Sequence, residues 1–243
     1  AGDLYDGDWP DHNTGLFFTK QVVRLRHAGV LVFLVSGNHD AESRITRALR
    51  LPENVTHFAS DRAHTQCVEN LTDTGLTLAI HGQSYAKRDV RKNLAAGYPP
   101  PVKGAFNVGV LHTALSGRAG HESYAPCDPD DLATKGYHYW ALGHVHSREV
   151  VAEKPWIVFP GCVQGRHIKE RGAKGCMVVT VDEQRGRSGG EVVDVEFEPL
   201  DVVRWLRCVV DVKGCENEEE VLTPVQHAFG EVRAAADGRS VAV

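Results

Sequence analysis

Four short polar segments of this sequence carry side chains that can hold metal ions. They are Gly2-Asp3, Gly37-Asn38-His39-Asp40, His112 and Gly143-His144-Val145-His146. A carboxylate has two oxygens and can bridge two cations, while imidazole and amide groups complete sites suited to manganese, iron or zinc. The glycines in these segments permit the tight turns and close backbone approach that ligand-bearing loops need. These residue types therefore favour a centre that holds a pair of cations.

Apolar runs immediately precede three of these segments and predict buried strands. The runs cover residues 30–35, 107–111 and 139–142. In an open α/β sheet, ligands gather in the crevice outside the carboxyl ends of the strands. Each segment alone has an ordinary explanation, because Asn and Asp also favour turns. Their repeated position after apolar runs instead predicts that widely separated residues converge on one site.

The remaining sequence predicts an α/β protein whose second half is mostly strands. Patterning and helix-start signals predict helices over residues 13–29 and 40–49, a polar helix over 85–96 and a helix start near residue 128. Shorter apolar runs predict strands at 55–58, 76–81, 156–159, 176–181 and 192–197. The pattern changes near Leu200. Beyond it we expect a strand over 202–212, a helix from residues 216–220 to 236, and a strand over 240–243.

The composition indicates a folded chain that does not span a membrane. Of its 243 residues, 42% are hydrophobic and 24% are charged, and no apolar run approaches the roughly 20 residues of a membrane span. We see no leader peptide, and the six cysteines form no Cys-x-x-Cys pair, so we expect free thiols in a reducing cytoplasm. The net charge of −5 gives no support for DNA binding, although basic clusters within residues 87–92 and 166–174 fit a local groove.

The order of the motifs resembles the calcineurin-like metallophosphoesterase superfamily. Its signature is Asp-x-His, Gly-Asp, Gly-Asn-His-Asp/Glu, a single His, and Gly-His-x-His, of which all but the first occur here. Residues 2–7, 79–85, 109–113 and 139–146 are most similar to bacterial DNA-repair exonucleases of the SbcD and YhaO types. The resemblance implies a four-layer sandwich of two mixed β-sheets flanked by helices over residues 1–200. It also implies the start of a small α+β capping domain over residues 201–243.

The resemblance also implies roles for the motif residues. The metal ligands would be Asp3, which bridges both ions, Asn38, His112 and His144 at the second ion, and His146 at the first. His39 would act on the phosphate, as general acid for the leaving oxygen or as a stabiliser of the transition state. Asp40 would orient His39 or cap the following helix, and the role of Asp6 is left open. Two divalent cations are implied, manganese foremost, with iron or zinc as alternatives.

The Asp-x-His motif has no counterpart in this sequence. Related sequences carry it on a first strand some tens of residues before Gly-Asp, so we interpret the chain as truncated there, with that strand missing. This leaves a full ligand set for one cation but only Asp3 and His146 for the other. We therefore expect the 243 residues to bind one cation better than two and to show little activity.

The function implied is that of a metal-dependent phosphodiesterase, acting as a DNA exonuclease or endonuclease in DNA repair through a hydroxide activated by two metals. A small-molecule phosphodiesterase or phosphatase, and a non-catalytic scaffold of the same fold, are the alternatives. The partners implied are DNA, an SbcC-like coiled-coil ATPase and, as an open option, a second copy of the chain. Gln164, Arg166 and His167 are further candidates for substrate contact, whereas His81 is expected to be structural.

Overall fold

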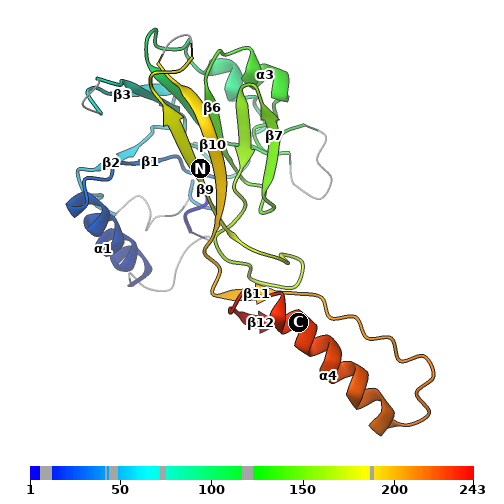
Figure 1. Cartoon of the computed structure of the whole chain (residues 1–243). Helices are drawn as coiled ribbons and strands as arrows, with labels where there is room; N and C mark the ends of the chain where they lie inside the picture. Colours follow the sequence, from blue (N-terminus) through cyan, green and yellow to red (C-terminus); the bar gives the residue numbers. More distant parts are fainter. Residues whose placement is uncertain (6–12, 42, 44–48, 72–74, 117–122, 187–188) are drawn as a thin grey trace. The chain divides into compact units, whose positions relative to one another are not determined.

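The computed structural model describes residues 1–5, 13–41, 43, 49–71, 75–116, 123–186 and 189–243. The chain forms two compact units. The first comprises residues 1–145, 149–159 and 179–195, and the second comprises residues 146–148, 160–178 and 196–243. The predicted domain boundary at residue 200 stays a prediction. Helices and strands together make a mixed α/β protein (Figure 1).

A six-stranded mixed sheet forms the centre of the first unit, in the order β3-β4-β5-β6-β8-β7. Strands β3, β6 and β7 of this sheet are labelled in Figure 1. Its strands are β3 (His64–Val68), β4 (Leu78–Gly82), β5 (Phe106–His112), β6 (Tyr139–Gly143), β7 (Glu149–Glu153) and β8 (Trp156–Phe159). Strands β4, β5, β6 and β8 run parallel, and β3 and β7 pair antiparallel at the two edges. The register places His112 beside Gly143, so the carboxyl ends of β5 and β6 coincide.

The core lies on both faces of this sheet. Leu111 belongs to one cluster of buried apolar side chains and Val110 to another, because successive side chains of a strand point to opposite faces. Trp140 of β6 is fully buried and lies beside Gly109 of β5. A Cβ at Gly109 would collide with the Trp140 ring, so the glycine is what allows the indole to lie against β5. Burial on both faces is typical of parallel strands.

A smaller parallel pair, β1 (Val32–Leu34) and β2 (Val55–His57), follows helix α1 (Asn13–His27). The prediction of a strand over 30–35 buried on both faces was wrong in extent and burial. Residues 30 and 31 are exposed, and β1 is half-buried throughout. Among the described residues, β2 is the strand that pairs with β1. Pairing with one short strand limits how much of β1 can be buried.

The predicted polar helix over residues 85–96 was also wrong, because only a short 3₁₀ helix (Ala95–Gly97) occurs there. The segment is held by contacts distant in sequence. The Tyr85 N–H donates to the Ser36 carbonyl, and the Val90 carbonyl accepts from the Ala125 N–H. These tertiary hydrogen bonds replace the helical ones, which shows how weak helix propensity is against tertiary context. Helix α3 (Pro129–Ala133) does begin where Asp128 predicted.

Other predictions differ in extent. The strand predicted over residues 202–212 is shorter in the structure, where β11 covers Val203–Trp205. The edge strands β3 and β7 were not predicted. Strand β3 escaped notice because most of its side chains are exposed and polar. Of the helix predicted over 40–49, residues 40 and 41 lie in a turn, residue 43 is non-helical, and residues 42 and 44–48 lie outside the described part of the chain, as does Asp6.

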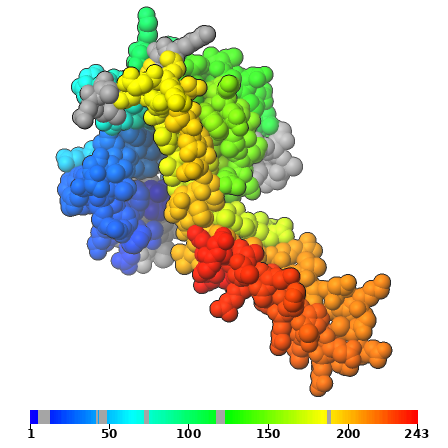
Figure 2. All heavy atoms as spheres, in the orientation of Figure 1, coloured from blue at the N-terminus to red at the C-terminus, as the bar shows by residue number. Residues whose placement is uncertain are grey.

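The second unit contains β11, paired in parallel with β12 (Ser240–Ala242), and helix α4 (Glu218–Ala234). The Asn217 side chain accepts from the Glu220 N–H at 3.0 Å and caps α4. This helix has no buried residue, and its atoms are open to view in orange and red in Figure 2. Strands β9 (Gly175–Asp182) and β10 (Glu191–Pro199) form a two-stranded sheet with residues in both units. None of the described helices has the length and apolar composition of a membrane span.

Candidate metal centre

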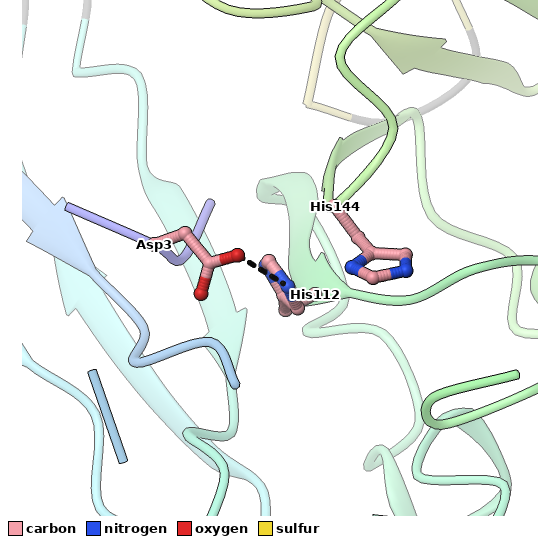
Figure 3. Close-up of side chains that lie close together, drawn as sticks. All are labelled: Asp3, His112 and His144. Atoms are coloured by element: carbon pink, nitrogen blue, oxygen red, sulfur yellow. Dashed lines mark ion pairs between the residues drawn. The ribbon is translucent and has the colours of Figure 1, made fainter. Parts of the chain in front are cut away.

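Side chains from three distant parts of the chain meet at the carboxyl ends of β5 and β6. His112 is the last residue of β5, His144 follows β6, and Asp3 comes from the amino-terminal segment. One ligand atom from each lies within 4.8 Å of the others (Figure 3). The Oδ1 atom of Asn38, which follows β1, lies 2.9 Å from His112 Nε2. The structure thus brings Asp3, Asn38, His112 and His144 together, and their role as ligands stays a prediction.

The contacts of His112 show how this cluster can hold a cation. Its Nδ1 lies 2.8 Å from the carbonyl oxygen of Ala1, which can only accept, so Nδ1 carries a proton. Nε2 lies 2.9 Å from Asn38 Oδ1 and 3.3 Å from Asp3 Oδ2, so either a proton on Nε2 or a cation in its place can hold these three atoms together. His112 is fully buried, so bulk water does not separate these atoms. A shared cation converts the same three atoms into ligands, and nitrogen and oxygen donors suit a borderline divalent metal.

Asp3 is held in its charged form. Burial opposes its ionisation, but hydrogen bonding and charge interaction with His112, together with the backbone N–H of His39, outweigh burial and keep the pKa of Asp3 below its ordinary value. That N–H donates to Asp3 Oδ1 at 2.9 Å. Asp3 is therefore a carboxylate at neutral pH, which is the form that binds metal ions.

The backbone around the cluster is strained and close-packed. Asp3 has φ 53° and His144 has φ 98°, in a region that residues other than glycine rarely adopt. Strain of this kind concentrates at functional sites, where surrounding structure enforces it. A Cβ at Gly37 would collide with Asp3 Oδ1 and the His112 ring, and one at Gly143 would collide with the Ala1 carbonyl. Both glycines permit the close approach that the sequence predicted.

Asp40 has a role that sequence reasoning missed. Its Oδ1 accepts from the Tyr5 N–H at 3.1 Å, and its Oδ2 accepts from the N–H groups of Leu4 at 3.1 Å and Gly37 at 3.2 Å. The prediction that Asp40 orients His39 or caps a following helix stays a prediction, because residues 42 and 44–48 lie outside the described part of the chain. These contacts join the loop that carries Asp3 to the loop that carries Asn38. The sequence alone contains no signal that links the Asp40 carboxylate to the backbone N–H groups of residues 4 and 5.

His39 lies in the turn after β1, half-buried. Its backbone is fixed to Asp3 by the bond described above, and its action on a phosphate stays a prediction. His146 belongs to the second unit, where its Nδ1 lies 2.6 Å from Glu170 Oε1. Nothing in the sequence singled out Glu170. His146 remains a predicted metal ligand.

Two other expectations have clear outcomes. The Gln164 side chain was a candidate for substrate contact, but it is occupied by backbone groups of Gly165, Val202 and Val203. This prediction was wrong, because the amide joins two segments of the second unit. His81 is fully buried between Thr65 Oγ1 at 2.8 Å and Asn107 Oδ1 at 3.0 Å, as a structural histidine should be.

Four exposed basic side chains lie in one segment of the first unit, and one of them is linked to the cluster through a tyrosine. Lys87, Arg88, Arg91 and Lys92 are all exposed. The Arg91 guanidinium lies 5.5 Å from the centre of the Tyr124 ring. The Tyr124 ring in turn lies 5.6 Å from the His144 ring. Arg91, which also pairs with Asp89, is therefore linked to the candidate ligands through one aromatic side chain.

Comparison with known proteins identifies the family. No family model matches the chain. Over 235 residues, 96% of the chain, it is 37% identical to the metallophosphoesterase YhaO of Bacillus subtilis. The chain belongs to the metallophosphoesterase superfamily. This agrees with the mixed α/β fold and with the cluster at the carboxyl ends of β5 and β6.

Other relatives of this metallophosphoesterase are DNA double-strand break repair proteins named Mre11. It is 27% identical to that of Methanopyrus kandleri over 242 residues, 91% of the chain. It is 26% identical to that of Sulfurisphaera tokodaii over 156 residues, 62% of the chain. The chain spans 55%, 51% and 38% of the lengths of these three relatives, about half or less.

Proposed function

We propose that this metallophosphoesterase hydrolyses phosphodiester bonds in DNA, as an exonuclease or endonuclease of DNA repair. Asp3, Asn38, His112 and His144 would hold one divalent cation, and His146 would be a ligand of a second. The observation that carries the proposal is the convergence of Asn38 Oδ1 and Asp3 Oδ2 on His112 Nε2, while the other ring nitrogen faces the Ala1 carbonyl. Nitrogen and oxygen donors of this kind suit manganese first, with iron or zinc as alternatives.

The cations would lower the pKa of water toward about 7 and stabilise charge on the phosphate. The chain's own residues position them. Asp3 is kept ionised by its contacts with His112 and the His39 N–H. The carbonyl of Ala1 fixes the His112 proton on Nδ1, so that Nε2 is the atom left for a ligand bond. Asp40 holds the two contributing loops together.

His39 would act on the phosphate group itself. Its N–H donates to Asp3, so its backbone is fixed against the proposed bridging carboxylate. A histidine at this position can donate a proton to the leaving oxygen or stabilise its developing charge, and such a group typically contributes 10²- to 10⁴-fold in rate. We expect it to affect turnover and not cation binding.

DNA is the substrate class that two observations favour over small phosphodiesters. The Mre11 relatives are named as DNA double-strand break repair proteins. Of the exposed basic residues Lys87, Arg88, Arg91 and Lys92, Arg91 lies over the Tyr124 ring, which itself lies against the His144 ring. A DNA backbone extends beyond the scissile phosphate, and Lys and Arg would bind its neighbouring phosphates. A small phosphodiester has no such neighbours to bind.

A manganese-dependent nuclease assay tests this function on the protein with the expected Asp-x-His strand restored. End-labelled oligonucleotides should be cleaved, with His39→Ala lowering cleavage by about 10²- to 10⁴-fold and rising salt weakening it. Cleavage of bis-p-nitrophenyl phosphate or cyclic nucleotides alone, insensitive to salt, would instead indicate a small-molecule phosphodiesterase. If the protein has no activity that is lost in His39→Ala, it would instead be a non-catalytic scaffold. An SbcC-like ATPase partner, a homodimer and a cytoplasmic location stay predictions, the last supported by six unpaired cysteines.

A further inference from the structure

We propose that Glu170 is a positioning residue for His146: it fixes the ring proton on Nδ1 and thereby presents Nε2 as the atom that binds a cation. This inference rests on the proposed function, in which His146 is a metal ligand. The two residues are 24 positions apart, in the second unit. No motif in the sequence connects them.

The hydrogen bonds of Glu170 determine the tautomer of His146. Glu170 Oε1 lies 2.6 Å from His146 Nδ1, and Oε2 accepts from the Arg166 N–H at 2.8 Å. A carboxylate has no proton to give, so the proton between Nδ1 and Oε1 comes from the imidazole. The Glu170 side chain is 8% exposed, whereas that of His146 is 42% exposed. The carboxylate is therefore fixed inside the unit while the ring extends outward with Nε2 free of this hydrogen bond.

The backbone of His146 is fixed as well. Its carbonyl accepts from the Cys162 N–H at 3.3 Å and from Lys174 Nζ, also at 3.3 Å. Lys174 is itself buried. Gly161 has φ 79°, and a Cβ there would lie 2.8 Å from the His146 carbonyl oxygen. With the carbonyl and Nδ1 both held, neither the backbone nor the ring can turn without breaking a hydrogen bond.

A competing explanation is that His146, Cys162 and Glu170 themselves bind a metal ion, since one ligand atom from each lies within 4.8 Å of the others. The hydrogen bonds argue against it. His146 Nδ1 and Glu170 Oε1 are 2.6 Å apart, the distance of a short direct hydrogen bond, and the other Glu170 oxygen accepts from the Arg166 N–H. The thiol of Cys162 donates to the His146 carbonyl at 3.7 Å. These are the contacts of a hydrogen-bonded group that holds His146.

Glu170→Gln makes a sharp test because an amide offers one acceptor and one donor where the carboxylate offers two acceptors. The Arg166 N–H cannot change its role, so the amide oxygen will turn toward it. The amide NH₂ then faces His146 Nδ1, which must become the acceptor. The proton moves to Nε2, and the nitrogen proposed to bind the cation loses its lone pair.

The tautomer is measured by long-range ¹H–¹⁵N correlation spectra of protein labelled with ¹⁵N-histidine, in conditions where the ring is neutral. His146→Gln assigns the signals. We expect Nδ1–H in the native protein, Nε2–H in Glu170→Gln, and Nδ1–H again in Glu170→Asp, which keeps two acceptors. Manganese titrated calorimetrically should bind 10- to 100-fold more weakly to Glu170→Gln, the usual effect of losing a partner that orients a ligand. Glu198→Gln, an exposed glutamate of the same unit, should change neither readout.

An Nε2–H tautomer in the native protein would overturn the inference, as would an unchanged tautomer in Glu170→Gln. A loss of manganese affinity in Cys162→Ser as large as that in Glu170→Gln would also overturn it, because it would make Glu170 a ligand in a three-residue metal site. If Glu170→Gln does not fold, the native spectrum and Glu170→Asp still decide the tautomer. If the tautomer is as expected but His146→Ala binds manganese normally, the ligand role in the proposed function fails and the effect of Glu170 on the ring stands.

Discussion

Asp40 should control cation binding without touching the cation. Its carboxylate accepts N–H groups from Leu4, Tyr5 and Gly37, and so holds the Asp3 loop against the Asn38 loop. Asp40→Asn keeps the size of the side chain but replaces one oxygen by an NH₂ group. If the NH₂ group takes the place of Oδ1, the Tyr5 N–H faces another donor and loses its hydrogen bond. If the NH₂ group takes the place of Oδ2, the N–H groups of Leu4 and Gly37 lose theirs.

The magnitude follows from counting these bonds. A hydrogen bond to a charged group contributes about 1.5–3 kcal/mol. At least one is lost outright in Asp40→Asn, and the others lose the charge of their acceptor. We expect the free energy of unfolding to fall by about 2–4 kcal/mol on this scale. Because the loops carry proposed ligands, manganese affinity should fall by about 10- to 100-fold, the range seen when a residue that supports a metal ligand is changed.

Isothermal titration with manganese measures the affinity, and urea unfolding followed by circular dichroism measures the stability. Asp89→Asn is the matched control, because this substitution makes the same chemical change at an exposed site of the same unit. Its affinity and stability should equal those of the native protein. Asp40→Asn with native manganese affinity would refute the reasoning that this carboxylate joins the two ligand-bearing loops.

Three further outcomes are expected. His39→Ala should lower cleavage by about 10²- to 10⁴-fold in the oligonucleotide assay while calorimetric manganese affinity stays native; a large loss of affinity would make His39 a ligand. Gly37→Ala should weaken manganese binding because its Cβ would enter the ligand cluster, whereas Gly97→Ala, with open space around it, should not. Asp201→Asn should cost about 3–5 kcal/mol in urea unfolding, since it leaves the buried Arg204 without its main partner. Burial opposes ionisation of Asp201, but the hydrogen bonds from Arg204 outweigh burial and lower the pKa of Asp201 below its ordinary value of 3.8. The stabilisation by the ionised carboxylate is therefore present above pH 3.8 and should be lost as the pH falls below that value. Equal loss of stability in the native protein and the variant on acidification would contradict this.

The strands that bear the candidate site were readable from the sequence because their pattern is local. Strands β5 and β6 are apolar runs that end in polar, ligand-bearing residues, and both occur where expected. Their parallel pairing brings His112 beside Gly143, so the convergence of His112 and His144 follows from two local patterns and one rule about sheets.

The parts that were not predicted depend on contacts between distant residues. The Asp40 carboxylate meets N–H groups 35 and 36 positions away, and Glu170 meets His146 from 24 positions away. Residues 85–96 have helical composition, but hydrogen bonds from elsewhere in the chain hold them in another conformation. Polar side chains can bond to many partners, and only the folded chain determines which one.

The most direct test is anomalous diffraction at the manganese absorption edge from crystals grown with manganese. The account predicts a peak bonded to Asp3, Asn38, His112 Nε2 and His144, and loss of that peak in His112→Ala. Manganese bound elsewhere, with these four side chains holding no ion, would contradict the central claim that they form a metal centre.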